Sequence, residues 1–99
     1  MSIIEQNKKI ILDLCRRYHV RQLYAFGSVL TDKFSTNSDI DMIVDFDSVN
    51  LENYADNYYD LKFSLEDLFK RKIDLLEEQA IVNPYFRKNV ERQKQLIYG

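Results

Sequence analysis

The sequence predicts a small α+β domain, in which helices cover one face of a small mixed sheet and an acidic cleft lies on the other. Two long stretches, 3–19 and 51–70, repeat apolar residues at the spacing of an amphipathic helix. The run 39–46 alternates acidic and apolar residues, which is the period of a half-buried strand. Shorter apolar runs at 22–26 and 73–76 complete the predicted sheet.

Length and composition favour a single domain over residues 1–99. A hydrophobic content of 45% and a charged content of 30% are typical of a soluble globular protein. The net charge of −2 argues against nucleic acid as the main partner. We find no signal peptide, and no apolar run approaches the roughly 18 residues that cross a membrane. We therefore expect a cytoplasmic protein.

The first predicted helix, 3–19, carries the only cysteine and ends at the only histidine. A single cysteine, Cys15, excludes an internal disulfide and a cysteine-based zinc cluster. It falls on the apolar side of the helix, where we expect it to be buried. His19 stands at the predicted C-terminus of the helix, where a polar or cationic side chain has a structural explanation.

The connections and the last helix follow from turn and cap signals. Residues 28–33 favour a short helix after the first strand, and 34–38 form a turn before the acidic strand. Asn83-Pro84 is typical of an N-cap followed by proline at the first helical position. We expect the last helix to run from there to about Ile97.

In the acidic strand and in the 51–70 helix, the side-chain pattern indicates which residues face the core. On the acidic strand, alternation predicts that the core receives Ile40, Met42, Val44 and Phe46, and that the opposite face carries Asp39, Asp41, Ile43 and Asp45. We expect Asp45 to be exposed to solvent.

The 51–70 helix carries an aromatic cluster of Tyr54, Tyr58, Tyr59 and Phe63. Such a cluster favours core packing; the alternative is a partner or self-association face on Tyr59 and Phe63.

The chemistry is concentrated in residues 27–41. Gly27-Ser28 ends an apolar run, and ten residues later comes Asp39-Ile40-Asp41. A glycine-serine pair at a strand end allows close backbone approach to an anion, and a helix that begins there turns its free N–H groups toward the anion. Asp39 and Asp41 stand at i and i+2, so a strand presents both carboxylates on one face. Magnesium accepts one or two protein carboxylates together with substrate phosphates.

Asp74 supplies a third acid within the 73–76 strand. If that strand pairs beside 39–46, Asp74 joins Asp39 and Asp41. Three carboxylates on adjacent strands can hold two cations, which stabilise the attacking and leaving oxygens of an in-line phosphoryl displacement.

This spacing resembles the nucleotidyltransferase superfamily of DNA polymerase beta. The pattern is Gly27-Ser28, ten residues, Asp39-x-Asp41, then the later Asp74. The short chain and its C-terminal region look like the minimal nucleotidyltransferase (MNT) branch, which includes the antitoxins of HEPN–MNT toxin–antitoxin pairs. The resemblance implies the polymerase beta-like fold and the transfer of AMP from ATP to a hydroxyl, with release of pyrophosphate.

The resemblance also implies roles for individual residues. Gly27 and Ser28 would hold the triphosphate, with Ser38 and Lys33 as further nucleotide-binding residues. The two magnesium ions would be bound by Asp39 and Asp41, and Asp74 would bind one of them and assist deprotonation of the acceptor. Many MNT sequences carry an arginine directly after Gly-Ser; here that residue is Val29, and Lys33 can act as a point charge in its place.

Three readings of the function stay open on the sequence. The chain has no room for an acceptor-binding domain, and the MNT resemblance implies a HEPN toxin as partner, with a toxin tyrosine as the acceptor. The second reading is a non-catalytic antitoxin that neutralises its partner by contact. The third is a small-molecule nucleotidyltransferase that acts as a homodimer.

Overall fold

A computed structural model describes residues 2–31, 34–35, 37–47 and 53–99. The elements, in chain order, are α1 (Ser2–Gln6), α2 (Lys8–Arg17), β1 (Val20–Phe26), the 3-10 turn η1 (Gly27–Leu30), β2 (Ile40–Phe46), α3 (Tyr54–Phe69), β3 (Ile73–Glu77), the 3-10 turn η3 (Glu78–Ala80), α4 (Pro84–Gln93) and β4 (Gln95–Tyr98). The predicted α+β class and mixed sheet are confirmed.

The four strands form one sheet in the order β3-β2-β1-β4. β2 runs antiparallel to β1 and parallel to β3, and β4 pairs antiparallel with the other side of β1. The register sets Asp41 beside Phe26 on one neighbouring strand and beside Asp74 on the other. The end of β1 and two of the predicted acids therefore lie in one row across the sheet.

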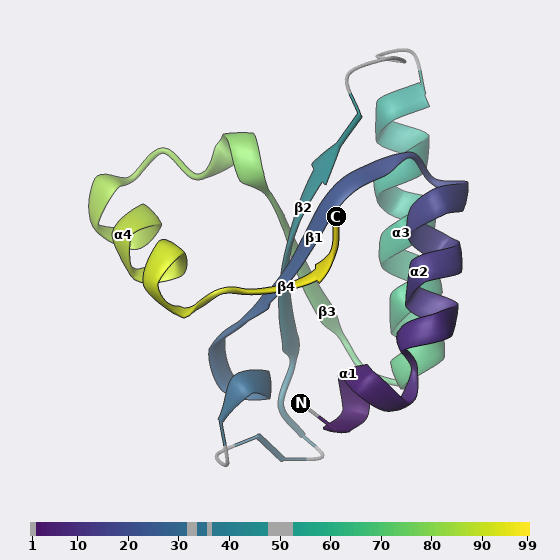
Figure 1. Ribbon diagram of the computed structural model, residues 1–99, viewed down its shortest axis with the longest axis horizontal. Helices are drawn as coiled ribbons and strands as arrows, with labels where there is room; N and C mark the ends of the chain where they lie inside the picture. The colour runs from purple at the N-terminus through teal and green to yellow at the C-terminus, as the bar shows by residue number, and fades with distance from the viewer. Residues whose placement is uncertain (1, 32–33, 36, 48–52) are drawn as a thin grey trace.

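The main hydrophobic core lies between the sheet and the helices α2 and α3, which pack side by side against one face (Figure 1). The predicted inward residues of β2 are all buried there: Ile40, Met42, Val44 and Phe46. Cys15 is buried as predicted, and burial raises the pKa of its thiol to about 12. Apolar alternation in β2 thus fixes which face of the strand carries the acids.

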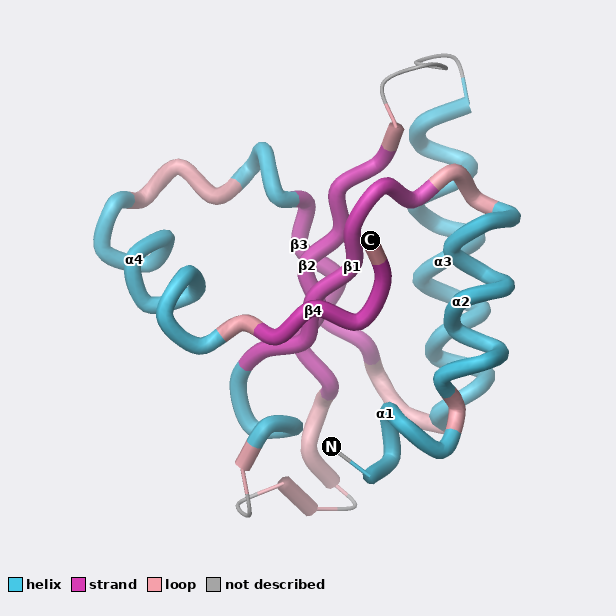
Figure 2. The backbone as a smooth tube through the Cα atoms, in the orientation of Figure 1, coloured by secondary structure: helices cyan, strands magenta, loops and turns pink. Residues whose placement is uncertain are grey.

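The acid-bearing face of β2 is partly covered by α4, which lies on the opposite side of the sheet from α2 and α3 (Figure 2). A second cluster there joins Ile43 of β2 to Ile81 and to Val90 of α4. The cleft predicted on this face is therefore restricted to the end of the sheet that carries Asp41. Asn83 caps α4 as predicted, because its side chain accepts hydrogen bonds from the Tyr85 and Phe86 amides.

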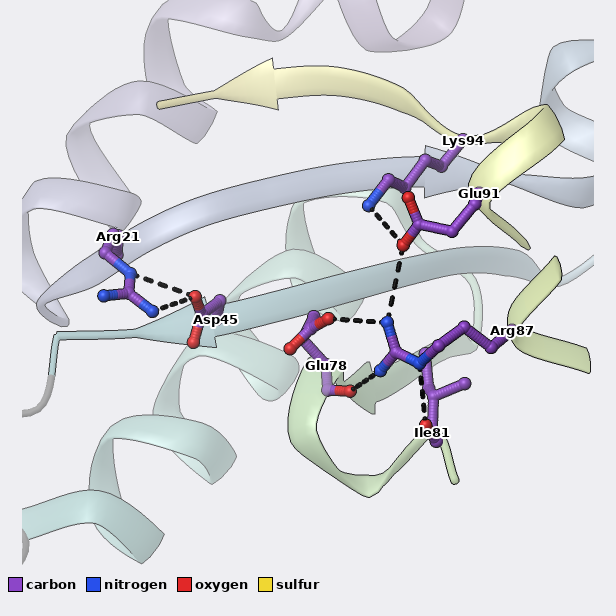
Figure 3. Close-up of polar contacts among 7 residues, drawn as sticks. All are labelled: Arg21, Asp45, Glu78, Ile81, Arg87, Glu91 and Lys94. Carbon is purple, nitrogen blue, oxygen red and sulfur yellow. Dashed lines mark hydrogen bonds and ion pairs between the residues drawn. The ribbon is translucent and has the colours of Figure 1, made fainter. Parts of the chain in front are cut away.

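Polar contacts of Arg87 fasten α4 to the turn that follows β3 (Figure 3). The guanidinium donates to the Glu78 carboxylate at 2.8 Å and to the Glu78 and Ile81 carbonyl oxygens at 2.7 and 3.0 Å. At the other end of β2, Asp45 is 8% exposed and accepts hydrogen bonds from Arg21 of β1. The expected exposure of Asp45 was wrong, because a partner 24 residues away in the sequence compensates its burial.

Both terminal helices differ from the sequence prediction. The 3–19 stretch is divided at Asn7, whose side-chain amide donates to the Ile3 carbonyl, and Ile10 is 50% exposed. The last helix ends at Gln93, and β4 follows in place of its predicted final turn. Ile97, the expected end of the helix, is buried in the main core from this strand. None of the helices in the described part of the chain has the length and apolarity of a membrane-crossing segment.

Candidate functional site

Gly27 opens the turn that follows β1 and lies directly against Asp41. Its φ of +78° is in the left-handed region, which glycine adopts without strain. A Cβ placed on Gly27 would stand 2.6 Å from Asp41 Oδ2, closer than packed atoms approach. Glycine is therefore required at this position for two reasons, the backbone conformation and the space taken by the Asp41 carboxylate.

Asp41 and Asp74 form a carboxylate pair across β2 and β3. The two residues are partners in the parallel register, so their carboxyl groups lie on neighbouring strands close enough to interact. Burial, which is the largest cause, and the neighbouring acids Asp74 and Asp39 together raise the pKa of Asp41 to about 6. A cation bound beside Asp41 would relieve the repulsion that disfavours its ionised form.

The third predicted acid is near this pair but not joined to it. Asp39 is exposed, and its charge still acts on Asp41. The side chain of Asp74 is 44% exposed and lies 3.7 Å from the Lys72 ammonium. Within the described residues, no group of three or more acidic, histidine or cysteine side chains is arranged to hold a metal ion. The pair alone still fits magnesium, which takes one or two protein carboxylates and completes its shell with phosphate and water.

A pocket of about 430 Å³ opens beside the carboxylate pair. Its lining combines the two acids with aromatic and aliphatic side chains and one lysine: Phe26, Asp41, Tyr58, Lys62, Asp74, Leu75, Leu76 and Phe86. The Phe26 and Phe86 rings meet edge to face at 6.2 Å, so β1 and α4 supply one wall. Tyr58 supplies another, and its hydroxyl donates to the Leu75 carbonyl at 2.5 Å. The pocket can take an apolar or planar group next to the acids.

The predicted nucleotide-binding residues are only partly brought to this place. Ser28 lies in η1, directly after Gly27, and its carbonyl accepts from the amide and hydroxyl of Thr31. Ser38 fixes the turn before Asp39, because its hydroxyl oxygen accepts from the Ser35 amide at 3.1 Å. Val29 is 4% exposed and belongs to the main core, so its side chain does not face the nucleotide side. Lys33 lies outside the described residues.

Three contributors near the site were missed by sequence reasoning. Lys62 and Tyr58 of α3 line the pocket, although the helical pattern assigned Tyr58 to the core. Arg71 contacts the turn that leads to Asp39. Its place in the basic run 70–72 indicates an interaction with the helix dipole or with nucleotide phosphates, and not this contact. No local signal in the sequence marks these contacts, since each joins residues far apart along the chain.

Two residues of the aromatic cluster in α3 pack against the core, and the other two are exposed. Tyr54 packs against Phe46 with the ring centres 5.1 Å apart, and Tyr58 packs against the core. Tyr59 and Phe63 are 52% and 58% exposed and stack on each other. Core packing is confirmed for the first two residues and is wrong for the last two.

The free energy of unfolding should fall as the pH rises through the range in which folded Asp41 loses its proton. Its pKa is about 6 in the folded chain against 3.8 ordinarily, so between these values the folded state binds more protons than the unfolded state. The contribution is present below about pH 4 and is lost as the pH rises through about 6. The shift corresponds to about 3 kcal/mol at most, and solvent screening of this partly exposed group reduces our expectation to about 1 kcal/mol.

Urea unfolding of the wild type and Asp41→Asn across this pH range tests the prediction. Asparagine does not titrate, so the difference between the two proteins isolates the carboxyl at position 41. The wild type should become less stable relative to the variant as the pH rises. A difference that stays constant over the whole range would contradict the raised pKa.

A glycine turn packed on a carboxylate pair, at the end of a small mixed sheet, is an arrangement suited to enzymes that transfer phosphate-containing groups. The sequence model of the "Nucleotidyltransferase domain" family matches residues 7–97. A protein of Methanocaldococcus jannaschii named "Putative protein adenylyltransferase MJ1379" is 35% identical over 97 residues, which are 98% of this chain and 91% of that protein. This chain belongs to the nucleotidyltransferase domain family and is a nucleotidyltransferase.

Solved structures agree with this assignment. A structure described as a "putative minimal nucleotidyltransferase" has a TM-score of 0.77 and 26% identity, and the match covers 95% of this chain and 92% of that one. A toxin–antitoxin structure with AMP-PNP has a TM-score of 0.72 and 24% identity, over 94% of this chain and 73% of that one. A third, a tri-AMPylated Shewanella oneidensis HEPN toxin in complex with an MNT antitoxin, has a TM-score of 0.65 and 22% identity, over 96% and 71%. The last two share the fold with this chain.

Proposed function

We propose that this protein transfers AMP from ATP to a hydroxyl of a partner protein, in a magnesium-dependent reaction, and that the acceptor is a tyrosine of a HEPN toxin. The observation that carries the proposal is the contact of Gly27 with Asp41, which is itself paired with Asp74. A backbone turn suited to phosphate and an acidic pair suited to a cation therefore adjoin each other. Two further facts support it, the adenylyltransferase name of the relative and the AMPylated HEPN toxin among proteins of the same fold.

The residues of the chain would divide the reaction as follows. Backbone N–H groups at Gly27 and Ser28 bind the triphosphate oxygens. Asp39, Asp41 and Asp74 would hold magnesium, which would supply positive charge at the attacking and leaving oxygens. The acceptor oxygen attacks the α-phosphorus of ATP, the bond to the β-phosphate oxygen breaks, and pyrophosphate leaves. Asp74 receives the proton of the acceptor hydroxyl.

The pocket beside the acids favours a protein side chain as the acceptor. Its Phe26 and Phe86 wall and its Leu75 and Leu76 surface are suited to an aromatic ring, and Asp74 lies within the same lining. A tyrosine ring placed there brings its hydroxyl toward Asp74, which is the geometry that proton removal requires.

Intact-mass analysis tests the proposal. Candidate HEPN proteins from the same genome are incubated with this protein, ATP and magnesium, beside an Asp41→Asn variant. Asp13→Asn is the matched control, because it neutralises an exposed aspartate that pairs with Arg16 on the far side of the sheet. We expect mass gains in steps of one AMP with the wild type and the control, and none with Asp41→Asn.

The alternatives predict different outcomes. A stable complex with a HEPN protein and no mass gain would replace the proposal by a binding antitoxin that acts through contact alone. Nucleotide transfer to small hydroxyl compounds in the absence of any partner would favour a small-molecule nucleotidyltransferase. Loss of the AMP steps when magnesium is removed by a chelator, and their return on its addition, would support the metal requirement.

A further inference from the structure

Arg71 lies between the end of α3 and the start of β3 and reaches the turn that leads into Asp39. One guanidinium nitrogen, Nη1, donates to the Ser35 carbonyl at 2.9 Å and to the Ser38 carbonyl at 3.0 Å. The guanidinium carbon lies 4.6 Å from the centre of the Phe34 ring. A single side chain therefore contacts the turn at both of its ends and through an aromatic ring.

The turn has its own internal hydrogen bonds but needs an attachment to the sheet. The Ser38 amide donates to the Ser35 carbonyl at 3.1 Å, and the Ser35 amide donates to the Ser38 hydroxyl oxygen at 3.1 Å. These bonds define the local shape of the turn. They do not fix its position relative to β3, which is the strand that carries Asp74.

Arg71 supplies that attachment from the chain segment immediately before Asp74. The next residue, Lys72, accepts a hydrogen bond from the Ile40 amide at 3.2 Å, which is the first contact between β3 and β2 at this end. Ser38 and Ile40 flank Asp39 in the sequence. The residues on both sides of Asp39 are therefore held by the two residues that precede β3.

We propose that Arg71 is a positioning residue, which anchors Phe34, Ser35 and Ser38 to the start of β3 and so places Asp39 beside the Asp41–Asp74 pair. The proposal rests on the metal-binding role of these acids given above. The Nε atom of Arg71 is buried without an acceptor in the described part of the chain. A buried unpaired donor costs free energy, so this arginine is not there to optimise stability alone. Lysine offers one point charge and cannot reproduce two carbonyl contacts and a stacked plane.

Two measurements on Arg71→Met and Arg71→Lys test the inference. The first is the hydrogen exchange of the Ser38 and Ile40 amides, which reads the turn and the first β2–β3 contact directly. We expect exchange to accelerate about tenfold in both variants. The Lys94 amide, which donates to the Val90 carbonyl in α4, should keep its rate, whereas general destabilisation would accelerate all three.

The second measurement is calorimetric affinity for ATP in the presence of magnesium. We expect a loss of about tenfold in both Arg71 variants, with no rescue by lysine. Lys70→Met is the matched control, because it removes the neighbouring exposed cation, which pairs with Asp67 at 3.5 Å. If Arg71 acts through Asp39, Arg71→Met combined with Asp39→Asn should bind no more weakly than Asp39→Asn alone.

The outcomes separate the inference from the function on which it rests. If the Ser38 and Ile40 amides exchange at the wild-type rate in the Arg71 variants, Arg71 does not anchor the turn, whatever the measured affinity for ATP. If the losses of ATP affinity caused by Arg71→Met and Asp39→Asn add up in the double variant, Arg71 does not act through Asp39. If the wild type itself fails to bind ATP with magnesium, the proposed function fails, and accelerated exchange still supports the anchor.

Discussion

Replacing Asp41 by asparagine is expected to lower AMP transfer on the order of 10³-fold, which corresponds to about 4 kcal/mol of transition-state stabilisation. Asp41 lies against the Gly27 turn and beside Asp74 on the neighbouring strand. Asparagine keeps the shape of the side chain and removes the charge that a cation would bind. Transfer rates from initial AMP incorporation measure the effect.

The same substitution should stabilise the free protein at neutral pH. Burial and the neighbouring acids penalise the ionised carboxylate, so an uncharged amide relieves a cost of about 1 kcal/mol. We therefore expect less activity and a higher denaturation midpoint in one variant. Asp13→Asn, far from the site, should change neither quantity. An Asp41→Asn variant that lost activity and stability together would indicate a packing role for Asp41 and contradict the assignment as a metal ligand.

Replacing Gly27 by alanine should have the second largest effect, a loss of about 100-fold in AMP transfer. The added methyl group would stand 2.6 Å from Asp41 Oδ2, so either the carboxylate or the turn must move. Displacement of a reacting group by about 1 Å is enough for a loss of this size. The positive φ of 78° adds strain, and we expect a loss of about 1–2 kcal/mol in stability.

Gly99→Ala is a matched control for the strain. Gly99 also has a positive φ, and a Cβ there would stand 2.8 Å from the Arg21 carbonyl, away from the acids. The control is expected to lose stability and to retain transfer activity at equal folded protein concentration. If both alanine variants lost activity in proportion to stability, the contact between Gly27 and Asp41 would have no specific role in the reaction.

The sequence alone was sufficient to predict the fold and to predict that the Asp41 and Asp74 carboxylates lie on neighbouring strands. Ile40, Met42, Val44 and Phe46 repeat with the period of a strand, and burying them necessarily turns Asp41 to the other face. Asp74 is found in the same way, as a single acid in a short apolar run that a parallel partner brings alongside. These predictions depend on the alternation of apolar side chains and on the pairing of the strands that it indicates, and both can be inferred from the sequence.

Features that depend on distant partners were not predictable. Asp45 has the same alternation as Asp41, and only Arg21 of the adjoining strand makes its burial tolerable. The last strand was assigned to a helix because four residues, Gln95–Tyr98, are too few to show a period, and their pairing with β1 is tertiary. The contacts of Arg71 with the 34–38 turn span more than 30 residues.

The row formed by Phe26, Asp41 and Asp74 bears on how the sequence of this protein can change in length. A deletion or insertion of one residue within β2 would exchange its two faces, so that an acid entered the core and an apolar side chain took the place of Asp41. Such changes are excluded by folding and by chemistry at once. Length variation among proteins of this design should therefore be found in the connections around the sheet, while β2 keeps a constant length.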